Sequence, residues 1–272
     1  MEKIIIIPDV HGRTFWKDAV YKYRNVEGVH IVFLGDYLDA YKDIDGIEAE
    51  DAIANFEEII DVARSANNIT LLIGNHDLHY WPIYLKCWGC RRYDLYKNDI
   101  SNMFLSNKDL FKVAFEIYIN DKQYLFSHAG VVKLWYEWVT GKLNRGTEYD
   151  KYYYKDAWEL SDEDAKLLDF ELNAEGLNSL LEHKQGQIVL GMVSRERGGY
   201  DRDGSCLWAD IHEHLWAWEK FDKDKLYQIF SHSFGYPSLD EYLIDENMAM
   251  LDCRKAFVLN CETGIITEYE NE

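Results

Sequence analysis

The chain has 272 residues, of which 47% are hydrophobic and 15% aromatic, and its formal net charge is −20. That length and apolar content suit a large folded domain rather than a disordered segment. The negative charge argues against binding to long nucleic acid, because affinity for a phosphate backbone comes from lysine and arginine. No stretch approaches the roughly 18 apolar residues of a membrane helix, and the N-terminus lacks a signal-peptide pattern. We therefore expect a cytoplasmic protein without membrane contact.

The first 77 residues predict three strands and two helices in alternation. Continuous apolar runs at 4–7, 30–34 and 69–73 are typical of strands that are buried on both faces. Between them, 14–23 and 47–63 carry apolar residues at helical spacing. A polar motif follows each strand at its carboxyl end, which is the edge where ligands bind in open α/β sheets.

The pattern changes beyond residue 77. The runs 113–119 and 123–127 flank Asn120-Asp121 and predict a β-hairpin. An acidic, aromatic-rich stretch at about 134–185, with leucines at helical spacing, predicts a helical insertion or cap within one domain that spans 1–272. Further apolar runs predict strands at 187–190, 226–230, 248–251, 256–259 and 265–267.

The polar motifs after the first three predicted strands carry the chemistry. They read Asp9-Val10-His11-Gly12, Gly35-Asp36-Tyr37-Leu38-Asp39 and Gly74-Asn75-His76-Asp77. Two more histidines, His128 and His232, each follow a later predicted strand. Carboxylate, amide and imidazole donors in this number can hold two divalent metals, which together activate a water molecule and clamp a phosphoryl group.

With these residues the chain resembles the calcineurin-like metallophosphoesterases. Its motif spacing is similar to that of the branch that holds the serine/threonine protein phosphatases and the symmetrical diadenosine tetraphosphatases. The strong match covers 4–77, and weaker matches at His128, 207–210, His232 and 251–252 extend it. The resemblance implies a mixed α/β fold, a two-sheet β-sandwich flanked by helices, and hydrolysis of a phosphoric ester.

The resemblance also implies a dinuclear centre whose metal ligands are Asp9, His11, Asp36, Asn75, His128 and His232. Asp36 matches the carboxylate that bridges the two metals. Manganese, iron, zinc or nickel accept this mixture of donors, whereas calcium strongly prefers shells made only of oxygen. In Asp-x-His an extended chain end places both side chains on one face, as the first metal requires.

Two further residues match catalytic positions. His76 matches the histidine that protonates the leaving-group oxygen, and Asp39 matches the carboxylate that orients this histidine and stabilises its imidazolium form. The implied reaction is direct attack on phosphorus by a hydroxide that bridges the metals.

The sequence departs from the family pattern after the second motif. The usual Arg-Gly is replaced by Ala40-Tyr41, so one positive contact to the substrate phosphate is missing. Arg13, Arg195 and Arg197 are the candidates to replace it. Phe234 stands where many nucleases and phosphodiesterases of the superfamily carry a second histidine, which favours the phosphatase branch.

The main functional hypothesis is hydrolysis of a phosphomonoester carried by a small molecule, a nucleotide or a phosphoprotein. Alternatives are a nucleotide or dinucleotide polyphosphate hydrolase and a phosphodiesterase. A different class is a catalytically silent scaffold that binds a protein, but the complete ligand set argues against it. Three other histidines, His79, His212 and His214, are interpreted as structural residues rather than ligands.

Overall fold

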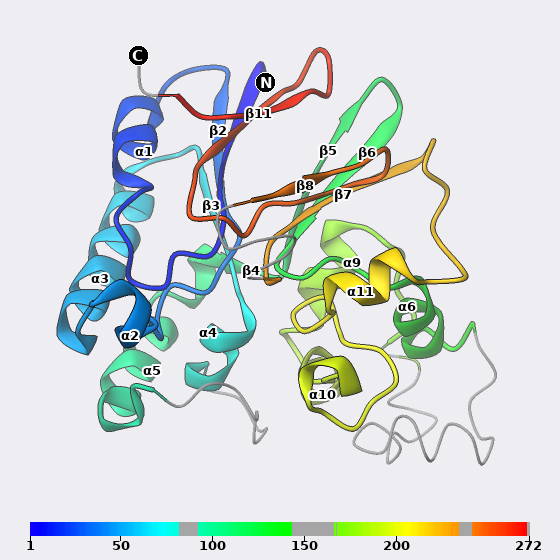
Figure 1. The fold of residues 1–272 in the computed structure, drawn as a ribbon, viewed down its shortest axis with the longest axis horizontal. Helices are drawn as coiled ribbons and strands as arrows, with labels where there is room; N and C mark the ends of the chain where they lie inside the picture. The colour runs from blue at the N-terminus through cyan, green and yellow to red at the C-terminus, as the bar shows by residue number, and fades with distance from the viewer. Residues whose placement is uncertain (82–91, 143–165, 167, 234–240, 271–272) are drawn as a thin grey trace.

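The computed structural model of the chain describes residues 1–81, 92–142, 166, 168–233 and 241–270. Across these residues, a pair of β-sheets face each other, and helices lie outside them (Figure 1). The mixed α/β sandwich that the sequence predicts is confirmed.

The first sheet brings the N-terminal motifs to one edge. Its strands, in spatial order, are β11 (Ile266–Glu268), β10 (Phe257–Asn260), β1 (Lys3–Ile7), β2 (Val29–Phe33), β3 (Ile69–Leu72) and β4 (Phe111–Lys112). Strands β1 to β4 are parallel neighbours, whereas β10 runs antiparallel to β1 and β11 runs antiparallel to β10. The carboxyl ends of β1, β2 and β3 therefore lie side by side.

The second sheet does the same for the later histidines. Its strands, in spatial order, are β5 (Ala114–Ile119), β6 (Lys122–Ser127), β7 (Leu226–Phe230), β9 (Met248–Met250) and β8 (Leu243–Ile244). Strands β6 and β7 are parallel, so the residues that follow them meet at one edge. Strands β5 and β6 form the predicted hairpin, and its turn residues Asn120 and Asp121 have φ values of 50° and 65°. Positive φ at both turn residues suits the right-handed twist of a hairpin.

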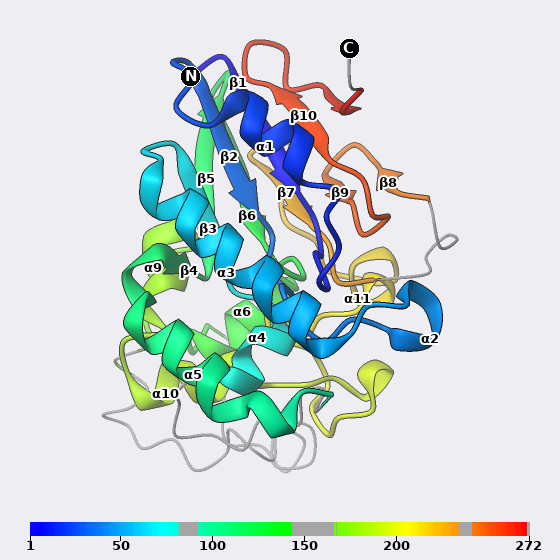
Figure 2. The same ribbon diagram turned by 90° about the vertical axis from the view of Figure 1, so that its left-hand side faces the viewer.

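Helices cover the outside of the first sheet and the lower end of the second. Helices α1 (Lys17–Tyr23) and α3 (Ala49–Ser65) lie against the first sheet (Figures 1 and 2). Helices α2 (Lys42–Asp45), α4 (Asn75–Tyr80) and α5 (Lys97–Ser106) lie below it (Figure 1). Below the second sheet are α6 (Lys133–Val139), α9 (Ala174–Ser179), α10 (Lys184–Leu190) and α11 (Ile211–Leu215) (Figure 1). Three short 3₁₀ helices are η1 (Asp94–Tyr96), η2 (Lys108–Leu110) and η3 (Arg195–Arg197).

Strand β1 shows how the core is divided. Ile4 and Ile6 belong to the cluster between the two sheets, whereas Ile5 and Ile7 belong to the cluster under the helices. Alternate residues of a strand point to opposite faces, so a strand that is covered on both faces needs an unbroken apolar run. The run of isoleucines in β1 therefore follows from its central place in the sandwich.

One predicted strand is wrong. Residues 187–190 lie in α10, which begins after His183, whose Nδ1 atom accepts a hydrogen bond from the backbone N–H of Gly186 at 2.9 Å. A short apolar run cannot separate a buried strand from a buried helix, and the histidine cap was the overlooked signal. The two-residue strands β4 and β8 were not predicted either.

The predicted insertion at about 134–185 includes residues that lie outside the described ones, namely 143–165 and 167. Among its described residues, α6 and α9 are helical. None of the described helices has the length and hydropathy of a membrane span.

Candidate metal centre

The predicted ligands meet at one edge of the sandwich because each follows the carboxyl end of a parallel strand. Asp9 and His11 follow β1, Asp36 follows β2, and Asn75 begins α4 directly after β3. The backbone N–H groups of Val10 and His11 both donate to the Asp36 carbonyl, at 3.1 and 2.7 Å. These bonds tie the first two motifs together before any side chain is considered.

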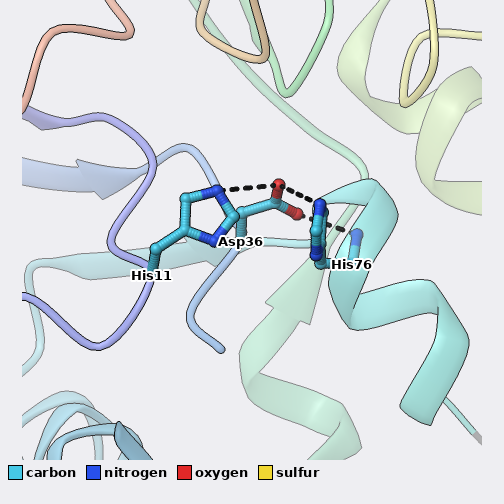
Figure 3. A group of neighbouring side chains, drawn as sticks. All are labelled: His11, Asp36 and His76. Carbon is cyan, nitrogen blue, oxygen red and sulfur yellow. Dashed lines mark hydrogen bonds and ion pairs between the residues drawn. The ribbon is translucent and has the colours of Figure 1, made fainter. Parts of the chain in front are cut away.

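The first half of the site is built around His11 and Asp36 (Figure 3). The His11 Nδ1–H donates to the Leu38 carbonyl at 2.8 Å, so the Nε2 atom of the neutral ring carries a lone pair. Nε2 lies 3.6 Å from Asp36 Oδ2 and 3.8 Å from Asp9 Oδ2. Burial lowers the pKa of His11 well below its ordinary value, which keeps the ring neutral.

The second half repeats this arrangement from the other sheet. The His128 Nδ1–H donates to the Leu34 carbonyl at 2.8 Å, and burial lowers the pKa of His128 to about 3. The Nε2 atom of His128 carries a lone pair and lies 2.9 Å from Asn75 Oδ1, 3.1 Å from His232 Nδ1 and 3.5 Å from Asp36 Oδ2. Within the described residues, the buried Nε2 atom of His232 has no hydrogen-bond partner.

These contacts test whether the residues fit two metals. The His128 Nε2 atom carries no proton, so it cannot donate to Asn75 Oδ1, and two acceptors face each other at 2.9 Å. Burial is the main cause that raises the pKa of both Asp9 and Asp36. The neighbouring charge of Asp252 raises the pKa of Asp9 further, and the charge of Asp9 raises that of Asp36. A cation placed between the facing lone pairs would remove both the repulsion and the charge penalty. The donor set therefore fits two divalent metals that share Asp36.

His76 lies next to Asp36, on the side opposite His11 (Figure 3). Its Nδ1 atom is 3.1 Å from Asp39 Oδ2, and its Nε2 atom is 3.9 Å from Asp36 Oδ2. The Tyr80 hydroxyl donates to the other oxygen of Asp39 at 2.7 Å. Asp39 is fully buried and held by Tyr80, so it can fix the orientation of the His76 ring.

Comparison with known proteins agrees with this geometry. The family model of the calcineurin-like phosphoesterases matches residues 2–249. The chain belongs to the calcineurin-like phosphoesterase family. No curated protein matches the sequence.

Solved structures similar to this phosphoesterase include two phosphatases. A protein serine/threonine phosphatase from Saccharomyces cerevisiae aligns with 100% of this chain and 80% of its own, with 16% identity and a TM-score of 0.44. A dimetal phosphatase from Danio rerio aligns with 98% of this chain and 95% of its own, with 14% identity and a TM-score of 0.40. Identity is low in both pairs, so the family assignment rests on the family model.

Asp77 organises the site of this phosphoesterase, and the sequence analysis gave it no role. Its Oδ2 atom accepts from the backbone N–H groups of Asp36 and Gly74, both at 2.8 Å. Its Oδ1 atom accepts from the N–H of Tyr37 at 3.0 Å. An acidic residue at the third position of helix α4 was the available signal, because such residues bind free N–H groups at helix starts.

Several candidate site residues of this phosphoesterase have an unusual backbone conformation. Positive φ values occur at His11 (45°), Asp36 (53°), Asp39 (59°) and His232 (71°). Such angles cost roughly 1–3 kcal/mol each in a residue other than glycine, and they cluster at functional sites. The surrounding hydrogen bonds hold this conformation in place.

The three predicted arginines occupy different surroundings. Arg13 is buried and forms a two-point ion pair with Asp45, at 2.9 and 3.0 Å. Arg197 lies 2.8 Å from Asp210 Oδ2 and donates to the carbonyl of His232. Arg195 is exposed on η3. The structure thus places Arg13 and Arg197 in ion pairs beside the site.

The three histidines that we interpreted as structural make other contacts. His79 Nε2 lies 2.9 Å from Asp94, and His212 Nδ1 lies 2.7 Å from Asp210. His214 donates from Nε2 to the carbonyl of Ala129 at 2.9 Å. The groups of convergent ligand atoms among the described residues are His11, Asp36 and His76, and Asp36, His128 and His232.

Proposed function

We propose that this chain is a dinuclear metal-dependent hydrolase of phosphomonoesters. The observation that carries the proposal is the pair of fixed Nε2 lone pairs, on His11 and His128, at 3.6 and 3.5 Å from one buried oxygen of Asp36. The substrate would be a phosphorylated small molecule, a nucleotide or a phosphoprotein.

The metals would be held by the two halves of the site, with Asp36 common to both. When bound, divalent metals activate a water nucleophile and neutralise charge on the phosphoryl oxygens. The carbonyls of Leu38 and Leu34 keep His11 and His128 in the tautomer that presents Nε2. These backbone contacts prepare the site before a metal arrives.

His76 would supply the proton. Asp39 lies 3.1 Å from Nδ1 of His76 and would accept the Nδ1–H, which orients the ring and leaves the Nε2–H to be donated. Nε2 faces the Asp36 side of the site, so it can reach the oxygen of a departing alcohol or phenol. Transfer of that proton prevents the leaving group from departing as an unstable anion.

The first test compares two model esters. Metal-stripped protein reconstituted with manganese would be assayed with p-nitrophenyl phosphate and with bis-p-nitrophenyl phosphate. We expect faster cleavage of the monoester. Faster cleavage of the diester would move the protein to the phosphodiesterases, and no cleavage of either ester would argue against the proposed activity.

The second test concerns the proton donor. We expect His76→Ala to lower kcat by about 10²- to 10⁴-fold, the usual contribution of general acid catalysis. The loss should be larger with phenyl phosphate than with p-nitrophenyl phosphate, because the poorer leaving group needs the proton more. Equal losses with both esters would contradict the assignment.

The matched control is His79→Gln on the same helix, which keeps an N–H donor for Asp94. It should leave both the metal content and the leaving-group dependence unchanged.

A further inference from the structure

Phosphate recognition needs a positive group that faces the substrate. A monoester dianion is bound best by the planar fork of a guanidinium group. Arg13 and Arg197 already bind Asp45 and Asp210, at 2.9 and 2.8 Å. A phosphate contact from either would have to compete with a carboxylate, so the rest of the rim matters.

Arg92, which the sequence analysis did not single out, reaches the same rim. Its Nη1 atom donates to the carbonyl of Asp39, and its guanidinium carbon lies 3.9 Å from the centre of the Tyr41 ring. The Tyr41 ring in turn contacts the His11 ring edge-on, with centroids 5.2 Å apart. Arg92 is exposed, so its charge is accessible from outside the site.

The backbone that carries Arg92 is anchored to the catalytic motifs. The hydroxyl of buried Tyr93 accepts from the N–H of Ala40 at 3.0 Å. The Tyr93 N–H donates at 3.2 Å to the Tyr80 hydroxyl, which itself binds Asp39. These bonds hold the Tyr93 side chain against Ala40, and Arg92 reaches the carbonyl of the preceding residue, Asp39. Ala40 is the position at which the sequence lacks the arginine that the family resemblance implies.

We propose that Arg92, stacked on Tyr41, binds the phosphate of the substrate and favours monoester dianions over diesters. The guanidinium group lies over the Tyr41 ring, hydrogen-bonds to the Tyr41 side chain and donates from Nη1 to the Asp39 carbonyl, so these contacts position a planar fork of five N–H donors at the rim, where it would bind the phosphate. The inference rests on the proposed function, because it takes the phosphoryl group to lie at the metals.

The test measures inorganic phosphate binding to manganese-reconstituted protein by calorimetry, together with kcat and KM for p-nitrophenyl phosphate. We expect Arg92→Ala to weaken phosphate binding and to lower kcat/KM by about 10- to 100-fold, the size of a charge-assisted contact. Arg92→Lys should be intermediate, because it keeps the charge but loses the fork. The preference for monoester over diester should fall in the same order.

The control is Arg24→Ala. Arg24 is also exposed and also lies over a tyrosine ring, that of Tyr21, at 4.7 Å, but it follows helix α1. The Arg24→Ala variant should bind phosphate as the wild type does. Metal content and thermal unfolding of each variant would show whether the Arg92 substitutions leave the fold intact.

The outcomes separate the two proposals. If Arg92→Ala binds phosphate and cleaves the monoester like the wild type, the role of Arg92 is wrong and the proposed function stands. If the wild type cleaves no ester but binds phosphate in an Arg92-dependent way, the role of Arg92 stands and the proposed catalysis is wrong. If the wild type cleaves the monoester but binds no phosphate, the role of Arg92 is wrong and the proposed function stands; if it neither binds phosphate nor cleaves an ester, both are overturned.

Discussion

Asp36 is the residue that the two halves of the site share. Its carbonyl accepts from Val10 and His11, and its N–H donates to Asp77. Of its carboxylate oxygens, Oδ1 accepts from the His76 N–H at 2.9 Å, while Oδ2 faces His11 and His128. A small movement of this residue would therefore disturb the candidate donors of both proposed metals together.

Gly74 is the position at which this dependence can be tested. A Cβ atom there would lie 2.1 Å from Asp36 Oδ1 and 2.5 Å from the Asp36 nitrogen. The φ of Gly74 is −98°, so alanine would suffer no backbone strain and the steric conflict acts alone. We expect Gly74→Ala to displace Asp36 and to weaken manganese binding at least about tenfold, with roughly 1–3 kcal/mol of overpacking cost.

Titration calorimetry with manganese measures the first effect and urea unfolding of the metal-free protein measures the second. Gly46→Ala is the control, because a Cβ at Gly46 meets nothing within 4 Å although its φ is 65°. It should lose about 1 kcal/mol of stability from backbone strain and keep its metal affinity. Manganese binding by Gly74→Ala with wild-type affinity would contradict this account of the site.

Helix α11 is the element whose packing depends on a neutral histidine. His214 is buried, donates to the Ala129 carbonyl and packs against Phe230, with ring centroids 4.8 Å apart. Burial lowers the pKa of His214 to about 4. Protonation of this ring would therefore weaken the packing of the helix onto the loop that follows β6.

The pH dependence of stability follows from that value. The unfolded chain has an ordinary histidine pKa of about 6.5, so it binds the proton first as pH falls. The contribution of His214 is present in full above pH 6.5 and is lost between about pH 6.5 and pH 4. Between pH 7 and pH 5 we expect this residue to cost the folded state about 2 kcal/mol.

His214→Gln should remove this share of the acid sensitivity, because glutamine can still donate to the Ala129 carbonyl but does not titrate. The measurement is urea unfolding of wild type and variant, both free of metal, at pH 7 and pH 5. Other titrating histidines are common to both proteins and cancel in the comparison. An equal loss of stability on acidification in the two proteins would contradict the prediction.

At the scale of the whole molecule, the candidate metal ligands come from both sheets. Asp9, Asp36 and Asn75 follow strands of the first sheet, whereas His128 and His232 follow strands of the second. Bound metals would therefore cross-link the two layers at the edge where buried carboxylates repel one another. Metal binding should therefore increase the stability of the folded protein.

We expect manganese to raise the Tm of the stripped protein by about 5 °C or more. A ligand at about 100 times its Kd adds about 2.7 kcal/mol, and about 1 kcal/mol corresponds to roughly 2–4 °C for a domain of similar size. Differential scanning calorimetry with and without a chelator measures the shift. Asp36→Asn should show a much smaller shift, and an unchanged wild-type Tm would argue against a dinuclear site.

How far the sequence could predict the site depends on how local each signal is. The motifs after β1, β2 and β3 were predictable, because parallel neighbouring strands must bring their carboxyl ends to one edge. The short run at 187–190 was not, because its apolar residues fit a strand and a helix equally well. Asp77 stands in a recognised motif with one of its backbone donors, Gly74, but the other two, Asp36 and Tyr37, come from the second motif, and only the fold brings them together.

The sequence alone determined the fold class, the family resemblance and the set of donors that meets at one edge, because these depend on repeated local patterns. Only the tertiary structure decided which nitrogen of His128 is presented, since the Leu34 carbonyl comes from the other sheet. It also decided that Arg13 pairs with Asp45 and that Arg92 stacks on Tyr41. Contacts between side chains that are far apart in sequence depend on how the chain packs, and no local pattern encodes them.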